Sequence, residues 1–185
     1  MKTHRLVPVL FAVGALALGV APVALGQESG GAAAAQSGPE RFNGTWRFAG
    51  SASQGRQTIE RAITRAVDGM NFITQPIATG RLRDKNPLVQ RIEIQLTATN
   101  ARVVFDGSRT YRGALNQWTN HTFDGETIRV QFLHRTDAIV QMFRTDGGTR
   151  RNVYRLLPDG RLRLEVTVHA GSLPRDLTYQ LTYRR

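Results

Sequence analysis

From residue 89 to the C-terminus, apolar and polar residues alternate with a period of two along most of the chain. The pattern is clearest in 91–96, 127–132 and 161–168, where Ile, Leu, Val or Phe fills every second position. Such alternation is typical of strands that bury one face. Asp-Gly and Asn turns separate the segments, and strands joined by such short turns pair in antiparallel fashion. With one short strand ahead of them, the predicted strands are 44–50, 90–98, 101–106, 109–115, 117–123, 127–134, 137–145, 149–157, 161–170 and 176–184.

A different period separates the first strand from the second. In 55–70, apolar residues recur every three or four positions while arginine and acidic residues take the other side, which predicts an amphipathic helix with Ser53 as its N-cap. A second helix is expected from Thr74, its cap, to Lys85, with Pro87 ending it.

The predicted fold class is therefore all-β with a short helical insertion. We expect a closed antiparallel up-and-down β-barrel of about eight to ten strands, with the helix pair after the first strand, because closure removes exposed strand edges. An open sheet packed on the long helix is the alternative architecture, and turn spacing alone does not decide between them.

The first strand, the helix pair and the hairpins resemble a known group of barrels. Gly44-Thr45-Trp46 on the first strand, helices directly after it and the hairpin-linked strands are similar to the calycin superfamily, which contains the lipocalins and fatty-acid-binding proteins. In order of elements the chain most resembles the intracellular fatty-acid-binding proteins over 41–185, most specifically at 139–147 and 154–162. The resemblance implies a barrel that binds a small hydrophobic or amphipathic ligand in its interior.

The resemblance also implies where a ligand's carboxylate would bind. In those barrels it is held by an arginine four residues before such an Asp-Gly turn and by an Arg-x-Tyr on the last strand. Arg155 occupies the first position, although both faces of its strand are partly apolar, so its direction stays open. The last strand keeps Tyr179 and Tyr183 but has leucine where the arginine would stand.

Five residues are candidate ligand contacts. Strand parity places Tyr179 and Tyr183 on the predicted inner face together with Phe105 and Phe132, and Arg155 joins them through the resemblance. A core filled by the same side chains around no ligand is the alternative. A structural role is expected for Trp46, which would close the barrel end with Arg184 stacked on its ring.

The N-terminal residues predict export. Residues 1–26 have a basic start, an apolar stretch and the small-residue site Ala24-Leu25-Gly26, as in a cleaved signal peptide. Pro8, Pro22 and several glycines argue against the alternative of a membrane anchor. Residues 27–40 are rich in Gly and Ala and read as a flexible linker, so the domain is expected at 41–185 in the periplasm or outside the cell.

The charge is strongly positive, with 25 Lys+Arg against 14 Asp+Glu and a formal net charge of +11. Beyond the leader all basic residues but Lys85 are arginines, a bias that is weak evidence for nucleic acid, so no nucleic-acid partner is expected. One alternative function is a filled barrel that binds an anionic envelope surface or a protein through its arginines. The residues considered for that surface are Arg81, Arg83, Lys85, Arg150, Arg151, Arg161, Arg163, Arg175, Arg184 and Arg185. A second alternative is a small outer-membrane barrel with its apolar face toward lipid.

The sequence contains no motif for catalysis or for a cofactor. There is no cysteine, no phosphate-binding loop and no dinucleotide fingerprint. The histidines His121, His134 and His169 lie on three separate predicted strands without metal-ligand spacing. We therefore expect no enzyme activity, no cofactor and no metal, but an exported, soluble, monomeric barrel that binds a small apolar or amphipathic molecule.

Overall fold

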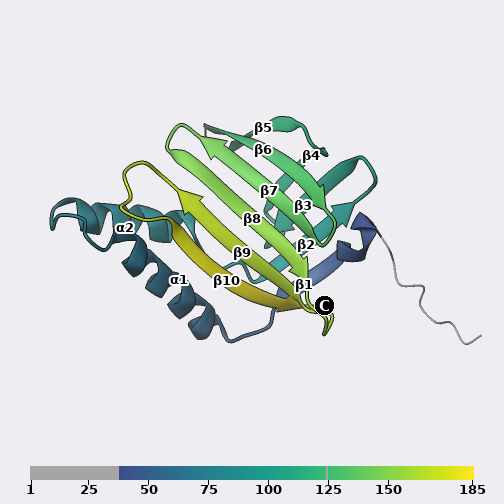
Figure 1. The fold of residues 1–185 in the computed structure, drawn as a ribbon, viewed down its shortest axis with the longest axis horizontal. Helices are drawn as coiled ribbons and strands as arrows, with labels where there is room; N and C mark the ends of the chain where they lie inside the picture. Colours follow the sequence, from purple (N-terminus) through teal and green to yellow (C-terminus); the bar gives the residue numbers. More distant parts are fainter. Residues whose placement is uncertain (1–37, 124) are drawn as a thin grey trace, which may run out of the picture. The chain divides into compact units, whose positions relative to one another are not determined.

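The computed structural model describes residues 38–123 and 125–185, so the predicted signal peptide and most of the predicted linker lie outside the described residues. The described chain consists of a short 3-10 helix, two α-helices and ten strands (Figure 1). In chain order these are η1 (Pro39–Phe42), β1 (Gly44–Phe48), α1 (Ala52–Val67), α2 (Thr74–Lys85), β2 (Arg91–Leu96), β3 (Asn100–Phe105), β4 (Arg109–Ala114), β5 (Trp118–Phe123), β6 (Glu126–Arg135), β7 (Ala138–Thr145), β8 (Gly148–Leu156), β9 (Leu162–His169) and β10 (Leu177–Arg184).

The ten strands form one antiparallel sheet in the order β4-β3-β2-β1-β10-β9-β8-β7-β6-β5. Apart from β4 and β5, each strand pairs with its neighbour in sequence, and β1 pairs with β10, which curls the sheet into an up-and-down barrel. Within the described residues no ladder joins β4 to β5. An isolated bridge links Leu115, which follows β4, to Phe132 on β6. The predicted barrel is therefore confirmed as a nearly closed one, and the open sheet packed on a helix is excluded.

The inner faces of the strands form one apolar core. Paired residues such as Trp46 and Ile92 on β1 and β2, or Leu164 and Tyr154 on β9 and β8, meet inside the barrel and are buried. The alternating positions that carry arginine, glutamate and glutamine, for example Arg91 on β2, face outward. This orientation is the opposite of the one an outer-membrane barrel requires.

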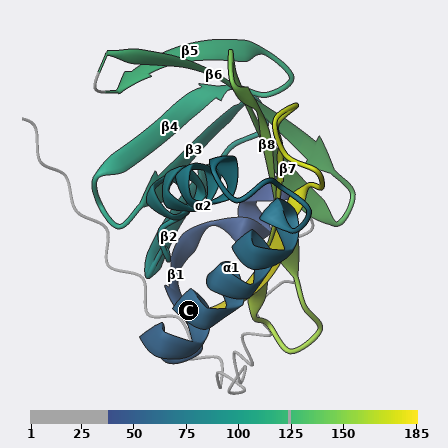
Figure 2. The same cartoon turned by 90° about the vertical axis from the view of Figure 1, so that its left-hand side faces the viewer.

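The two helices lie together on one side of the barrel (Figure 2). Ser51 caps α1 by accepting a hydrogen bond from the backbone N–H of Gln54, so the cap stands two residues before the predicted Ser53. The apolar face of α1 packs against β10. This approach is close, since a Cβ added to Gly55 would lie 2.7 Å from a methyl carbon of Leu88. A larger residue at the point where α1 meets the barrel would therefore require the side chains of Leu88 and Phe48 to shift.

Trp46 lies at the end of the barrel away from α2 and is fully buried. Its indole N–H donates to the carbonyl of Phe42 at 2.9 Å, and the guanidinium carbon of Arg185 lies 4.7 Å from its ring centroid. The predicted stacking partner, Arg184, is corrected to Arg185. Tyr183 faces inward, so the next residue, Arg184, faces outward and lies opposite Arg47. Arg185, which follows the strand, lies over the indole ring of Trp46.

Candidate ligand cavity

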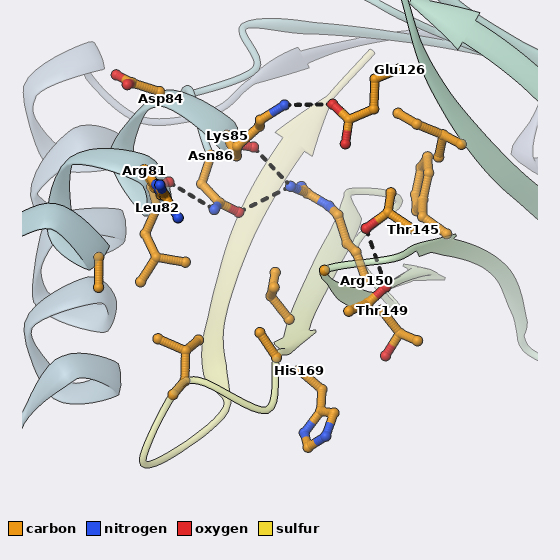
Figure 3. Close-up of a pocket in the computed structure, with 18 of the residues that line it drawn as sticks. Arg81, Leu82, Asp84, Lys85, Asn86, Glu126, Thr145, Thr149, Arg150 and His169 are labelled. Atoms are coloured by element: carbon orange, nitrogen blue, oxygen red, sulfur yellow. Dashed lines mark hydrogen bonds and ion pairs between the residues drawn. The ribbon is translucent and has the colours of Figure 1, made fainter. Parts of the chain in front are cut away.

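A cavity of about 980 Å³ lies in the half of the barrel next to α2. Its walls come from α2 and the residues that follow it, from the adjoining parts of β3 to β9, and from the loop before β10 (Figure 3). Volumes of this size are typical of ligand pockets, which range from about 300 to 1,000 Å³. The volume is therefore sufficient for a small lipid-sized molecule.

One wall of the cavity is aromatic. The ring of Tyr111 on β4 lies edge-on to Phe105, Phe123 and Phe143, with centroid separations of 5.7, 5.3 and 5.0 Å. Edge-to-face packing holds these rings in fixed orientations. The wall thus offers a preformed apolar surface to the body of a ligand.

Arg150 on β8 brings a positive charge to this cavity. It stands opposite Phe143 on β7 and Val168 on β9, both of which also line the cavity, so its side chain points inward. Its guanidinium donates to the side-chain oxygen of Asn152 at 2.9 Å. It also donates to the side-chain oxygen of Asn86 at 3.0 Å (Figure 3). These partners hold the guanidinium in place at the wall.

All hydrogen-bond acceptors of Arg150 in the described residues are neutral. Besides the two asparagines they are the carbonyl of Lys85 at 3.4 Å and the hydroxyl of Tyr179 at 3.3 Å. No carboxylate of the described chain lies within ion-pair distance of this guanidinium. A partly buried cation loses hydration free energy that only an anion fully offsets. The cavity wall therefore holds an uncompensated positive charge.

The hydroxyl of Tyr111 lies near the same charge. Tyr111 packs against Phe143, which is the strand partner of Arg150, and both Tyr111 and Arg150 line the cavity. Burial raises the pKa of this tyrosine, while the positive charges of Arg109, Arg150 and Lys85 act to lower it. The hydroxyl makes no hydrogen bond to any residue in the described part of the chain. A neutral phenol O–H in the same cavity as Arg150 is a second donor for an anionic group.

Beyond Arg150 the barrel is filled by a buried polar network rather than by open space. Asn152, Gln141 and Tyr154 are fully buried, and the hydroxyl of Tyr154 donates to Gln141 Oε1 at 2.6 Å. Burial strongly raises the pKa of Tyr154, so it remains neutral and keeps its donor. None of the three lines the cavity, which therefore ends at Arg150.

At the mouth, α2 is held across the opening mainly by exposed polar contacts. Arg83 on α2 donates to both carboxylate oxygens of Glu60 on α1 at 2.7 and 2.8 Å. Lys85 Nζ lies 2.8 Å from Glu126 on β6, but both side chains are largely exposed, and exposed ion pairs contribute about 0–1 kcal/mol. The helix has no fully buried residue. A helix with so little buried surface opens at low cost in free energy.

The five predicted ligand contacts are placed as follows. Phe105 lines the cavity, and its contact with a ligand remains a prediction. Phe132 is buried in the core outside the cavity wall. Tyr179 and Tyr183 face inward as expected, but their hydroxyls already bind Asn86 and the carbonyl of Val89, and neither residue lines the cavity.

Arg155 points away from the interior. It forms ion pairs with Asp137 and Glu165 on the outer surface of the barrel, and it stands opposite Arg163 and Ala138 in the sheet. The prediction of Arg155 as an interior ligand residue is therefore corrected. The arginine of β8 that faces the cavity is Arg150, five residues earlier, and Arg81 of α2 and Arg109 of β4 also line the cavity.

No three His, Asp or Glu side chains gather closely enough to hold a metal ion in residues 38–123 and 125–185. The helices of that same part of the chain are too short or too polar to cross a bilayer.

Comparison with known proteins supports the architecture. No protein-family model and no curated protein sequence matches this chain. Solved structures do match. An SAHS protein from Ramazzottius varieornatus has a TM-score of 0.52 and 10% identity, covering 80% of this chain and 98% of its own. Apo lipid binding protein 8 of Caenorhabditis elegans has a TM-score of 0.50 and 11% identity over 81% and 99% of the two chains. A point mutant of the fluorescent protein UnaG has a TM-score of 0.50 and 17% identity over 79% and 96%. The chain therefore has a calycin-like barrel fold.

Proposed function

We propose that this protein binds a small amphipathic molecule in the cavity next to α2, with an apolar body against the aromatic wall and an anionic head group at Arg150 and Tyr111. The observation that carries the proposal is the inward guanidinium of Arg150, which has only neutral partners in the described chain. A carboxylate or phosphate at this point would supply the missing negative charge and accept from the free phenol as well.

The apolar part of the ligand follows from the aromatic wall, which adjoins Arg150 at Phe143. Phe105, Phe123 and Phe143 surround Tyr111, and burial of apolar surface there contributes about 25 cal/mol per Å². The likeness to the C. elegans lipid binding protein supports a lipid-like ligand, although it is a likeness of fold.

Entry of the ligand is proposed to occur by displacement of α2. The helix is attached to α1 by the exposed pair Arg83–Glu60, to β6 by the exposed pair Lys85–Glu126 and to β8 through Asn86, which follows it. An incoming anion competes with Asn86 and with the carbonyl of Lys85 for the guanidinium of Arg150. Binding of the head group therefore weakens the contacts that close the helix over the cavity.

We further propose that the protein acts after export, as a soluble protein of the periplasm or the extracellular space. The leader-like residues 1–26 and the small-residue site before Gln27 support this. Expression of the full chain in a bacterium, followed by the intact mass of the product in the periplasmic fraction, tests the proposal. A product that begins at Gln27 is expected, and an unprocessed chain in the cytoplasm would contradict export.

Mass spectrometry of an organic extract from the purified protein tests the binding function. We expect a stoichiometric amphiphile with an acidic head group from the wild-type protein and from the Arg155→Met variant, whose substitution lies outside the barrel. The Arg150→Met variant should retain much less of it. Extracts without such a molecule, together with no binding of added decanoate by the purified protein, would refute the function.

A further inference from the structure

On the outer face of the barrel, Arg129 of β6 and Arg144 of β7 are direct partners in the antiparallel register. Both are exposed, and like charges directly opposite each other destabilise a sheet. Arg151 of β8 lies diagonally across from Arg144, since it is paired with Met142, two positions along β7. Three exposed guanidinium groups are thus carried by three neighbouring strands.

Another pair of opposed arginines shows how the same sheet neutralises such a repulsion. Arg155 and Arg163 also face each other, on β8 and β9. Glu165 lies between them, with Oε1 3.5 Å from Arg155 Nε and 3.1 Å from Arg163 Nε. In that pair one carboxylate serves both cations.

Arg129 and Arg144 have an aromatic ring in place of that carboxylate. Their guanidinium carbons lie 5.3 and 5.6 Å from the ring centroid of Trp118 on β5, which is half-buried. A cation–π contact at an exposed site contributes about 0.5–1 kcal/mol and leaves the donor N–H groups free. Neither arginine, nor Arg151, forms an ion pair with any residue of the described chain. The ring therefore orients two cations without neutralising them.

We propose that Arg129, Arg144 and Arg151, oriented by Trp118, form a binding site for phosphate groups on the outer face of β6 to β8. A phosphate group offers several oxygens and up to two negative charges, so it accepts from two guanidinium forks at once. A single carboxylate has only two oxygens and one charge to offer. The site is separate from the interior cavity, none of whose lining residues belongs to it.

The arrangement also argues against base stacking as the purpose of Trp118. Two guanidinium groups already lie within contact distance of its ring, so the ring is not an open platform of the kind that single-stranded nucleic acid requires. The phosphate belongs either to a soluble polyphosphate or to a lipid head group, and the two sources are distinguished experimentally.

The test uses the fluorescence of the full-length protein. Of the two tryptophans, Trp46 is fully buried at the barrel end and Trp118 lies in the site. Titration with inorganic tripolyphosphate at constant ionic strength should change the Trp118 emission and saturate. The Trp118→Phe variant should lose the fluorescence change, and calorimetry should still detect tripolyphosphate binding to it.

Charge-matched variants separate a local site from general attraction to a basic protein. Arg129→Gln and Arg144→Gln should each weaken tripolyphosphate binding about tenfold, as expected for the loss of one charge-assisted contact. Arg47→Gln removes one exposed arginine from β1, which also stands opposite arginines, and should leave the affinity unchanged. Equal weakening in all three variants would overturn the proposal, as would a titration without saturable binding.

A vesicle experiment identifies the source of the phosphate. Sedimentation with vesicles of phosphatidylcholine alone is compared with vesicles of phosphatidylcholine and phosphatidylglycerol in equal parts. Binding to the anionic vesicles that is lost in Arg129→Gln and kept in Arg47→Gln assigns the site to lipid head groups. Absence of vesicle binding, with tripolyphosphate binding intact, assigns it to soluble phosphates.

Discussion

Replacement of Arg150 by methionine removes the cavity's inward charge while keeping an unbranched side chain of similar length. The wild-type guanidinium donates to Asn152, Asn86, Tyr179 and the carbonyl of Lys85, all of which are neutral. The substitution thus removes donors to uncharged groups and, in the ligand complex, the proposed donor to the head group.

Two opposing effects act on stability in this variant. A buried acceptor left without its donor costs about 1–3 kcal/mol, and Asn152 is fully buried while Asn86 is nearly so. The substitution also removes a partly buried cation that has no anionic partner. The folded protein then no longer bears the desolvation cost of that charge, which offsets part of the loss. We therefore expect the free energy of unfolding to fall by no more than about 2 kcal/mol, which a domain of ordinary stability tolerates.

The effect on ligand affinity should be larger and selective for charge. A hydrogen bond to a charged group contributes about 1.5–3 kcal/mol, which corresponds to a loss of about ten- to a hundredfold in affinity for an anionic ligand. An uncharged ligand of the same chain length does not depend on this contact. Its affinity should change by less than about threefold, since the aromatic wall at Tyr111 is intact.

Calorimetric titration with decanoate and with decanol measures both quantities. Arg155→Met is the matched control, because it removes an arginine from the outer face of the same strand and should not change either affinity. Equal losses for decanoate and decanol in Arg150→Met would show that the variant disturbs the cavity rather than a charge contact. Undiminished decanoate affinity would refute the role of Arg150.

Further predictions concern packing and pH. Gly55→Ala should lower the free energy of unfolding by about 1–3 kcal/mol, because the added methyl group overlaps the side chains of Leu88 and Phe48. Gly80→Ala on α2, with no heavy atom within 4 Å of an added Cβ, should raise it by about 0.5–1 kcal/mol. Urea unfolding of both variants checks this, and destabilisation by Gly80→Ala equal to that by Gly55→Ala would contradict the close approach of α1. Burial raises the pKa values of Tyr111, Tyr154 and Tyr183 above their usual value of about 10. As pH rises above about 10, these tyrosines lose their protons in the unfolded chain before they lose them in the folded protein. The free energy of unfolding is therefore highest below that pH. Above it, it should fall by up to about 1.4 kcal/mol per pH unit for each tyrosine. Urea midpoints between pH 9 and 11 should show a shallower decline in Tyr183→Phe, and an identical decline would refute the contribution of Tyr183.

The barrel could be predicted from the sequence because its signal is repeated and local. Period-two segments such as 91–96 and 161–168 match β2 and β9, and the turn residues between strands leave only antiparallel neighbours as partners. The helix α1 was predictable from the change of period after Phe48, and α2 from the capping and proline signals at Thr74 and Pro87. The missing ladder between β4 and β5 was not, because the pairing of two edges depends on the curvature of the whole sheet.

The residues of the cavity were harder to predict. Val140 and Val153 are buried on the outer face with Ala138, so β7 and β8 have apolar residues on both sides and their parity does not show which face is inside. The resemblance suggested Arg155 as an interior residue, and the strand pattern left its direction open. The structure shows that Arg150 is the inward arginine of β8. It lies on the same face of the strand as the buried Asn152 and Tyr154.

Tyr111 illustrates a second difficulty. Strand parity indicates an inward position for it on β4, but nothing in the sequence shows that its hydroxyl lies near Arg150 and Lys85, which come from β8 and α2. The same holds for Asn86, which immediately follows α2 and reaches Arg150 across a separation of 64 residues. Contacts between residues so far apart depend on how the helix is seated on the barrel.

The central claim is that a ligand's anion pairs with Arg150, and carbon NMR of decanoate labelled at its carboxyl carbon tests it most directly. A cation beside a bound carboxylate favours the charged form, whereas an apolar cavity favours the neutral acid. We predict that protein-bound decanoate titrates at a lower pH than free decanoate, and that this shift is lost in Arg150→Met. A bound carboxyl that titrates at or above the pH of the free acid would contradict the account.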